Sequence, residues 1–503
     1  MNQAISESNL TATPDRDRAI ALANSELGLL INGRVKASAE LLDIDVVDPS
    51  TGEVVVTVPR AGKEDINEAV RAAKSALDGP FGRASARDRE NMLRRVTDLV
   101  ERHREELSLL EALDAGKPIG LTRAVDIPLS IDNLTYYAGW PTKIYGETIP
   151  AGGPDMLVYT RNEPVGVNAQ IIPWNFPLFD ATGRIAMSLA AGCPIVLKAS
   201  EVTPLSAMYL GKLIQEADIP PGVVNIVPGY GQEAGRALTS HPDVAVIGFT
   251  GSTSVGREIG EYGARTLKRV SLELGGKSPT VLFDDCDMEA AVKSAVGGIF
   301  FNTGQVCSAG SRLLVHTKIY DEVVRRLSQY AREMKVGRAF ADGVEMGPVI
   351  SATQYDKVRS FIATGIKQGG VASGGLDRPA GTTAGGFFIA PTIFSDLPED
   401  AQAVREEIFG PVLVVERFND FEDGLRKANA GRYGLASSVW SRNVVTCTRF
   451  AHGLKAGTVW VNCYHMYDIA VPWGGVKESG IGRERGAASL AHLLEKKVVW
   501  SAA

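Results

Sequence analysis

Cysteine is scarce in this chain, and the few cysteines are not spaced like metal ligands. The 503 residues include five cysteines, at positions 193, 286, 307, 447 and 463. An odd number without a CxxC pair or a Cys/His cluster excludes a disulfide framework and a structural zinc site. We therefore expect no metal, and we expect all but one of the cysteines to be small buried apolar groups.

The chain also lacks long apolar runs and dense runs of one charge. No stretch is long enough to span a bilayer, and residues 1–25 have no apolar core of the secretory type. We therefore expect a cytoplasmic protein without a membrane partner. The formal net charge is -6 and the basic residues are spread along the chain, so nucleic acid is not an expected partner.

The hydrophobic pattern predicts an α/β protein. Polar residues 1–28 are expected to form an arm or a short surface helix, and residues 63–77 and 86–114 have helical spacing. Apolar runs at 165–172, 193–198, 223–227 and 244–249 alternate with helices, and a second series extends from 279 to about 462. This alternation predicts two doubly wound domains with parallel sheets covered on both faces. Residues 140–162 and the tail from about 492 fit neither series and are expected to be strands that pair elsewhere.

Two glycine-rich turns follow predicted strands, at 228–235 and 249–256. The first places its third glycine one residue late for GxGxxG. In the second, the free N–H groups of a helix start and the Ser252 hydroxyl could hold a pyrophosphate. The alternative for both turns is tight packing of strand against helix.

Three residues have the chemistry of acyl transfer on sulfur. Cys307 lies in the polar turn 301–308 (FNTGQVCS), which favours a reactive, partly exposed thiol over a packing cysteine. Glu273 lies between leucines, where desolvation would make it a base near neutral pH; the alternative is an edge-strand carboxylate facing water. Asn175 lies between prolines in a stiff turn, either as an oxyanion donor or as a turn-forming asparagine.

Seven motifs together resemble those of the NAD(P)-dependent aldehyde dehydrogenase superfamily, most closely its non-acylating, broad class 1/2-like members. The similarity extends from about Leu29 to the C-terminus. The motifs are PWNFP (173–177), LKASE (197–201), FTGST (249–253), ELGGK (273–277), the turn around Cys307, EEIFGP (406–411) and PWGGVKESG (472–480).

The resemblance implies a domain plan and a mechanism. It implies a Rossmann-like cofactor domain (29–141 and 164–274), a catalytic domain (275–484) and an oligomerisation element (142–163 and 485–503), so that the chain forms a dimer or tetramer. The Cys307 thiolate would attack the aldehyde, with the oxyanion held by Asn175 and the Cys307 backbone N–H. After hydride transfer, Glu273 would activate water to hydrolyse the thioester.

The resemblance also implies the cofactor site. The expected cofactor-binding residues are Ile171, Trp174, Lys198, Glu201, Gly231, Gly251, Ser252, Glu407 and Phe409. Lys198 and Glu201 follow a strand and would bind the adenosine ribose, although the local sequence alone also fits a surface ion pair. Because Glu201 would accept from a free 2′-hydroxyl and repel a 2′-phosphate, NAD is expected and NADP is less favoured.

The substrate tunnel is expected to be lined by Phe176, Asp180, Gly183, Phe301, Val306, Tyr464 and His465. Gly183 stands where many relatives carry a bulky aromatic residue, so a wider tunnel is expected. Asp180 would make one wall polar, or it would only complement a helix N-terminus. The aromatic entry favours medium or large apolar or aromatic aldehydes.

Three rival functions follow from the same residues. An amino-aldehyde (betaine-aldehyde-like) oxidiser would use acidic tunnel residues, for which Asp126 and Asp180 are candidates. A CoA-acylating semialdehyde dehydrogenase would need no Glu273 base. A cysteine hydrolase would need a histidine beside Cys307, and only His465 is close to any motif.

Overall fold

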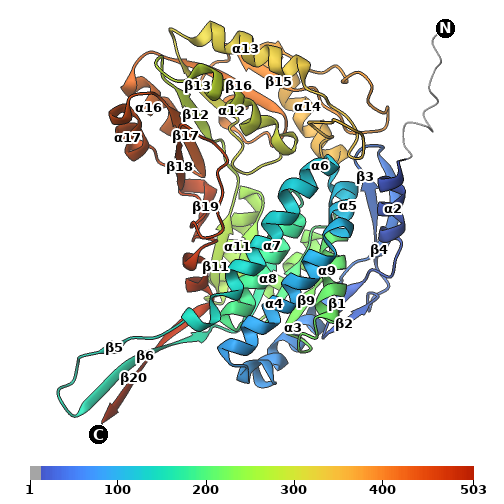
Figure 1. Ribbon diagram of the computed structural model, residues 1–503, viewed down its shortest axis with the longest axis vertical. Coiled ribbons are helices and arrows are strands. Elements are labelled where there is room, and N and C mark those ends of the chain that lie inside the picture. The colour runs from blue at the N-terminus through green and yellow to red at the C-terminus, as the bar shows by residue number, and fades with distance from the viewer. Residues whose placement is uncertain (1–12, 503) are drawn as a thin grey trace.

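The computed structural model describes residues 13–502 and contains two large, mainly parallel sheets, each in its own domain (Figure 1). The first has eight strands in the order β19-β11-β10-β7-β8-β9-β1-β2. Its five central strands are parallel, while β19, β1 and β2 pair antiparallel at the two edges. The bounds are β1 (Leu29–Ile31), β2 (Arg34–Lys36), β7 (Val167–Ile171), β8 (Ile195–Lys198), β9 (Val224–Ile226), β10 (Val244–Thr250), β11 (Arg269–Glu273) and β19 (Gly480–Ile481).

Helices cover both faces of the first sheet, as a doubly wound fold requires. One hydrophobic core joins the sheet to α4 (Ala86–Arg102), α5 (Arg104–Ala115), α7 (Ile127–Ala138), α8 (Pro177–Ala191) and α9 (Leu205–Glu216). A second core joins its other face to α3 (Lys63–Asp78), α10 (Arg236–Ser240) and α11 (Thr253–Arg265). A hairpin of β3 (Asp43–Asp48) and β4 (Glu53–Pro59) forms a separate two-stranded sheet.

The second domain is built on a seven-stranded sheet in the order β14-β15-β16-β13-β12-β17-β18. All neighbours are parallel except β14 and β15. The strands are β12 (Pro279–Leu282), β13 (Arg312–His316), β14 (Val371–Ser373), β15 (Thr392–Ser395), β16 (Val412–Phe418), β17 (Ala436–Trp440) and β18 (Thr458–Val461). Its helices are α12 (Met288–Phe300), α13 (Tyr320–Glu333), α14 (Ala352–Lys367), α15 (Gln402–Arg405), α16 (Phe421–Asn429) and α17 (Val444–Gly453). The α/β prediction with two parallel-sheet domains is confirmed.

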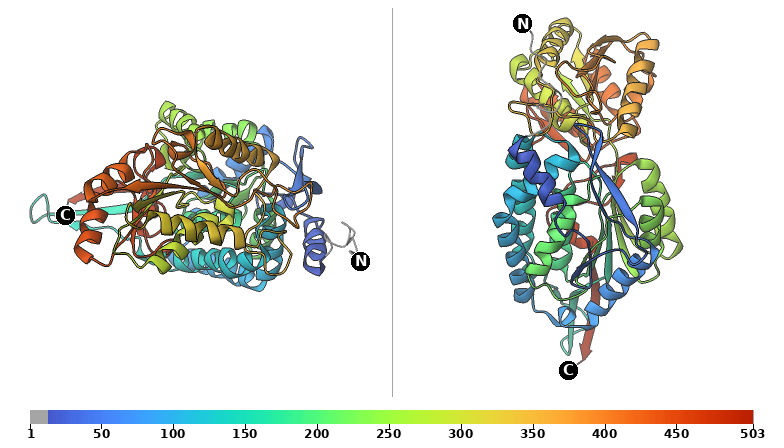
Figure 2. Two further views of the ribbon diagram at one scale, coloured as in Figure 1. Left: turned by 90° about the horizontal axis from the view of Figure 1, so that it is seen from above. Right: turned by 90° about the vertical axis from the view of Figure 1, so that its right-hand side faces the viewer.

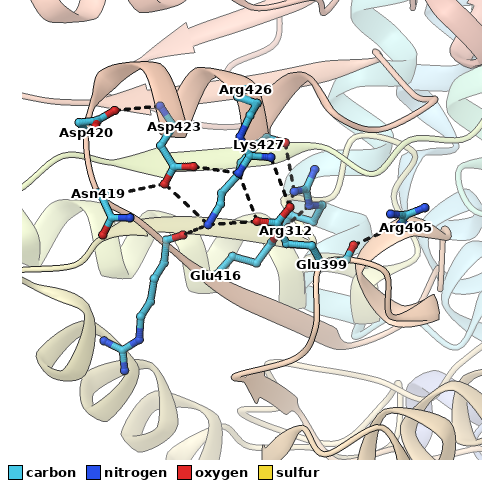
Figure 3. Close-up of polar contacts among 10 residues, drawn as sticks. Arg312, Glu399, Arg405, Glu416, Asn419, Asp420, Asp423, Arg426 and Lys427 are labelled. Carbon is cyan, nitrogen blue, oxygen red and sulfur yellow. Dashed lines mark hydrogen bonds and ion pairs between the residues drawn. The ribbon is translucent and has the colours of Figure 1, made fainter.

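A buried ion pair stabilises the second sheet from within. The Arg312 guanidinium on β13 donates from Nε and Nη2 to the Glu416 carboxylate on β16, at 2.8 and 3.1 Å. Arg312 also donates to the Lys427 carbonyl, and so connects the sheet to α16 (Figure 3). A charged pair removed from water needs this full set of partners.

The third sheet is an arm that extends from the first domain (Figures 1 and 2). It contains β5 (Thr148–Ile149), β6 (Met156–Pro164) and β20 (Leu494–Ala502), in the order β20-β6-β5. All nine residues of β20 pair antiparallel with β6, although more than 300 residues separate the two strands in the sequence.

Two sequence predictions need correction, and one open alternative is decided. The helix expected at 86–114 is two helices, because His103 leaves helical geometry (φ -102°, ψ 22°). Of the two alternatives for residues 1–28, an arm or a short surface helix, the structure has the helix α2 (Pro14–Ala23), whose Arg16 pairs with Asp48 at 3.0 Å; residues 1–12 lie outside the described part. Residues 480–481, expected in the catalytic domain 275–484, form β19 at the edge of the first sheet because β11 offers an unpaired edge.

Within 13–502, no helix has both the length and the apolar character needed to cross a membrane. No group of three or more His, Cys, Asp or Glu side chains in this range is placed to hold a metal ion.

Candidate active site

A cavity of about 750 Å³ lies where the two domains meet, and residues from both domains line it. Of the residues predicted from the sequence, fourteen line this cavity: Cys307, Glu273, Asn175, Trp174, Gly251, Ser252, Glu407, Phe409, Phe176, Asp180, Phe301, Val306, Tyr464 and His465. These residues are spread over almost 300 positions of the chain, so the fold itself brings them together.

The chain passes between the domains directly beside this cavity. Strand β11 of the first sheet ends at Glu273, and β12 of the second begins at Pro279. A side chain at Gly275 would lie 2.2 Å from the Glu407 carboxylate, and one at Gly276 would lie 2.6 Å from the Cys307 carbonyl. Both positions therefore require glycine, because the crossing segment touches the loops that carry Glu407 and Cys307.

The backbone before Cys307 has an uncommon conformation. Asn302, Thr303 and Gly304 have consecutive positive φ angles of 47°, 57° and 70°. The left-handed backbone conformation costs free energy for the two non-glycine residues. Contacts with surrounding residues must therefore hold the loop in this conformation. Thr303 donates to the Gly347 carbonyl at 3.1 Å, and the Gln305 side chain accepts from the Ile350 amide at 2.9 Å.

Asn175 connects this loop to the first domain. Its Nδ2 donates to the Gln305 carbonyl at 2.9 Å, and the Asn302 Nδ2 donates back to the Asn175 carbonyl at 3.1 Å. One of the two Asn175 amide hydrogens is used in this way, which fixes the orientation of the group. The second hydrogen is available in the cavity, as an oxyanion donor requires.

Glu273 is buried without a hydrogen-bond partner in the described residues. Burial raises the pKa of its carboxyl group well above the ordinary value, and the nearby Glu484 charge raises it further. The charges of Arg184 and Arg485 oppose this rise. A desolvated carboxyl with a raised pKa is a suitable base near neutral pH.

Burial also dominates the chemistry of Cys307. It raises the pKa of the thiol to about 12, with a further upward contribution from Glu273, while Arg485 acts in the opposite direction. The residue is only partly covered, because its side chain faces the cavity. The free thiol is therefore accessible but poorly ionised. A positive charge in the cavity would be needed to stabilise the thiolate beside Glu273.

One end of the cavity has the features of a dinucleotide site. Ser252 caps α11, its Oγ accepting from the Val255 amide at 3.4 Å, and Gly251 precedes it. Across the cavity, the Gly276 amide holds the Glu407 carboxylate at 3.0 Å. The Trp174 and Phe409 rings meet edge to face, 5.2 Å apart.

Four of the predicted cofactor residues do not line the cavity: Ile171, Lys198, Glu201 and Gly231. They lie at the carboxyl ends of strands of the first sheet or in the segments that follow those strands. Lys198 ends β8 and is buried, and its Nζ lies 3.1 Å from Glu201 Oε2. Burial lowers the pKa of Lys198, and the Glu201 charge opposes that change. Ile171 ends β7, and Gly231 begins a short π-helical turn with open space where a side chain would be.

The other end of the cavity is aromatic. Phe176 stacks on Phe301 with ring centres 6.2 Å apart, and His465 lies 5.9 Å from Phe301. Burial lowers the pKa of His465 to about 4, so its ring is neutral. Tyr464 donates to the Ser308 carbonyl at 2.8 Å, which connects the aromatic loop to the residue after Cys307.

Gly183 is the predicted tunnel residue that the structure does not bring to the cavity. A side chain there would meet Asn133 of α7 at 3.2 Å, and the glycine lines only a small separate pocket of about 20 Å³. Arg485 lines both this pocket and the main cavity. The missing aromatic side chain thus does not widen the main cavity, because Gly183 does not line it.

Sequence reasoning missed the aromatic and charged wall beyond Asp180. Tyr467, Trp473, Glu484 and Arg485 all line the cavity. Glu484 forms an ion pair with Arg184, whose Nη2 also donates to Thr250 at 2.6 Å. A signal was present in the charged run 483–485 that follows the PWGGVKESG motif, since the motif itself borders the cavity at Trp473.

The fold and the site define a class: a two-domain α/β enzyme with a cavity between the domains that is lined by a cysteine thiol, a buried carboxyl group and a side-chain amide. The comparisons with known proteins agree. Residues 35–499 match the family model described as the aldehyde dehydrogenase family. The chain belongs to this family.

Individual relatives cover nearly the whole chain. The mitochondrial aldehyde dehydrogenase family 2 member B4 of Arabidopsis thaliana is 47% identical, over 95% of this chain and 88% of its own. The mitochondrial benzaldehyde dehydrogenase of Antirrhinum majus is 45% identical, over 94% and 88%. The structure of the Bacillus cereus aldehyde dehydrogenase in complex with NAD+ has a TM-score of 0.94 at 44% identity, covering 98% of this chain and 99% of that one.

The electrostatics of the cavity predict how Cys307 reacts without cofactor. Because its pKa is high, alkylation by iodoacetamide should be slow at neutral pH and should rise steadily with pH. Glu273 is neutral below its raised pKa and charged above it, and the charge then opposes ionisation of the thiol. Glu273→Gln should therefore be alkylated about three- to tenfold faster, with a difference that grows with pH.

Mass spectrometry of the modified peptide measures this rate at Cys307 alone. Cys307→Ala should lose the label, whereas Cys447→Ala, at a buried cysteine outside the cavity, should retain it. A Glu273→Gln protein that is alkylated more slowly than the parent at high pH would contradict the assignment.

Proposed function

We propose that this enzyme oxidises an aldehyde to the carboxylic acid with NAD, through a covalent bond to Cys307. The observation that carries the proposal is that Cys307, Glu273 and Asn175 line one cavity whose other end is suited to a dinucleotide. Each of these residues supplies one element of acyl chemistry on sulfur: nucleophile, base and oxyanion donor.

In the first half of the reaction, Cys307 Sγ bonds to the aldehyde carbon and the carbonyl oxygen becomes an oxyanion. The free Asn175 amide hydrogen and the Cys307 backbone N–H donate to that oxyanion. The Asn175–Gln305 hydrogen bond keeps the donor in place, so that little reorganisation is needed. The carbon then loses hydride, the C=O bond re-forms, and a thioester remains on Cys307.

Bound NAD supplies the hydride acceptor for this chemistry. The residues present fit such a group on two observations: the Ser252-capped helix start and the open space at Gly231. Ser252 and Gly251 would hold the pyrophosphate, with Ile171 beneath the same glycine-rich face. Glu407 would hold the nicotinamide ribose.

The adenosine ribose would be held by Lys198 and Glu201. Only one oxygen of Glu201 is engaged by Lys198, which leaves the other to accept from a ribose hydroxyl. The Trp174 and Phe409 rings would close the cleft beside the nicotinamide ribose.

In the second half, Glu273 removes a proton from a water molecule that attacks the thioester carbon. The C–S bond breaks, the acid leaves, and the Cys307 thiolate is restored. The buried carboxyl is suited to this step because its raised pKa lies closer to neutrality than that of an exposed glutamate.

The substrate class that fits is a medium or large aromatic aldehyde. Phe176, Phe301 and Tyr464 surround the space in front of Cys307, and their rings favour a flat apolar body. The benzaldehyde dehydrogenase relative supports this choice.

Transfer of the acyl group to CoA is disfavoured by the buried Glu273 base. A cysteine hydrolase is disfavoured because no histidine in the described residues forms a hydrogen bond with Cys307.

Replacement of Glu273 should separate the two halves of the reaction. Glu273→Gln should release about one NADH per active site in a rapid burst with benzaldehyde, because hydride transfer precedes hydrolysis. Its steady-state rate should then fall by roughly 10²- to 10⁴-fold. Stopped-flow absorbance of NADH measures both phases.

Cys307→Ala should show neither phase, and Cys447→Ala should behave as the parent. Added CoA should leave the parent's product a free acid. A burst absent in Glu273→Gln, or acyl-CoA formed by the parent, would contradict the proposed sequence of steps.

Cofactor choice should depend on the Glu201 carboxylate. Its charge would repel a 2′-phosphate, so Glu201→Gln should raise the kcat/KM ratio of NADP to NAD by roughly 10-fold. Glu216→Gln, at the exposed end of α9, is the matched control and should leave the ratio unchanged. If the kcat/KM ratio of NADP to NAD is unchanged in Glu201→Gln, the assignment of Glu201 to the adenosine ribose site is wrong.

We also propose that the arm of β5, β6 and β20 joins subunits into a dimer or tetramer. The outer edge of β20 presents nine residues to solvent without a pairing strand in the described chain. Leu157, Val498 and Trp500 are 54%, 51% and 58% exposed, so the arm combines an open edge with apolar surface.

Charges on this surface should separate the subunits. The double variant Val498→Glu with Trp500→Glu should reduce the molar mass in solution, measured by light scattering after size-exclusion chromatography. Leu267→Glu, at a residue 92% exposed away from the arm, should keep the parent mass. An arm variant with the parent mass, or a monomeric parent, would contradict the proposal.

A further inference from the structure

Arg485 is a cation enclosed by aromatic rings inside the catalytic cavity. Its guanidinium carbon lies 4.5 Å from the centre of the Phe179 ring, 5.1 Å from Tyr467 and 5.4 Å from Trp473. These contacts use the charge of the guanidinium and leave its N–H donors free. Within residues 13–502 the group has no hydrogen bond and no ion pair shorter than 4 Å.

The position of Arg485 relates it to the reacting centre. It lines the same cavity as Cys307 and Glu273, and its charge lowers the pKa of both groups against the effect of burial. Phe179, Asp180, Glu484 and Arg485 line both this cavity and the small pocket at Gly183. The guanidinium therefore forms part of the cavity wall. The end of a substrate distant from its aldehyde group would contact this part of the wall.

An occupied aromatic cage changes what the cavity accepts. Three rings around one site are the usual means of binding a quaternary ammonium group. Here the protein's own Arg485 fills that place, so a cationic substrate would meet a like charge. The amino-aldehyde alternative is disfavoured on this ground.

The other charges on this wall are largely compensated. Glu484 is paired with Arg184. Asp180 faces Arg184, Arg485 and Glu484, and burial raises its pKa to about 6. No ion pair joins Asp180 to Arg485, so the guanidinium donors stay available to an acceptor that enters the cavity.

We propose that Arg485 binds a carboxylate on the substrate, so that the preferred aldehydes are aromatic or medium-length aldehydes with a carboxylate at the far end. This proposal rests on the proposed function and specifies its substrate class. A guanidinium can donate two parallel hydrogen bonds to a carboxylate, and such charge-assisted bonds are stronger than bonds between neutral groups. The aromatic walls would hold the body of the same molecule.

A matched substrate pair tests the proposal on the parent enzyme. The kcat/KM for 4-carboxybenzaldehyde should exceed that for its methyl ester by roughly 10-fold or more, since the ester has similar size but no charge. The corresponding aldehyde with a trimethylammonio group should be the poorest of the three. A ratio of acid to ester at or below one, or preference for the cation, would overturn the proposal.

Variants identify the residue responsible. Arg485→Leu should bring the acid-to-ester ratio down to about one, and Arg485→Lys should keep part of it, because an ammonium retains the charge but not the two-point geometry. Asp180→Asn should raise the ratio, because it removes a competing carboxylate. Arg449→Leu is the control, since Arg449 also lies over a ring, Phe421 at 5.1 Å, but does not line the cavity.

A binding measurement distinguishes failure of this proposal from failure of the proposed function. Loss of all aldehyde oxidation would refute the function alone. In that case 4-methylbenzoate should still protect Cys307 from alkylation better than its methyl ester does, and Arg485→Leu should abolish the difference. Equal protection by acid and ester would overturn the carboxylate site.

Discussion

The active site depends on the exchange of hydrogen bonds between Asn175 and the loop before Cys307. Asn175 belongs to the first domain, and Asn302 and Gln305 belong to the second. The two bonds hold the domains in register at the point where the nucleophile lies. They also enforce the left-handed backbone at 302–304, which such residues rarely adopt alone. The amide that would stabilise the oxyanion is therefore also the group that positions the nucleophile.

Burial sets the chemistry that this arrangement can perform. Glu273 and Cys307 lie in one cavity, burial raises the pKa of both groups, and the charge of Glu273 raises the pKa of Cys307 further. A charged Glu273 therefore opposes ionisation of the Cys307 thiol, which limits unproductive reaction of the thiol. Arg184 and Arg485 moderate this conflict. The reactivity of the thiol thus depends on the charges around the cavity as well as on the geometry of the site.

The sequence predicted the parts of this molecule that depend on local pattern. Alternating apolar runs and helices identified both parallel sheets, and contiguous motifs identified most of the fourteen predicted residues that line the cavity. It did not predict that Asn133 and Arg485 would lie near Gly183, because neither belongs to a motif that the sequence revealed. Nor did it predict that β19 returns to the first sheet, since a strand of two residues has no periodicity to detect.

The wall near Gly183 shows how residues away from the reacting groups can act on substrate choice. A side chain at Gly183 would meet Asn133 of α7 at 3.2 Å, so an aromatic residue there would require this wall to repack. Arg485 lines the same small pocket, and its guanidinium lies over the Phe179 ring. Because a cation attracts an acceptor over a longer range than an apolar wall can, the charge of Arg485 would act on substrate choice while Cys307, Glu273 and Asn175 keep their arrangement.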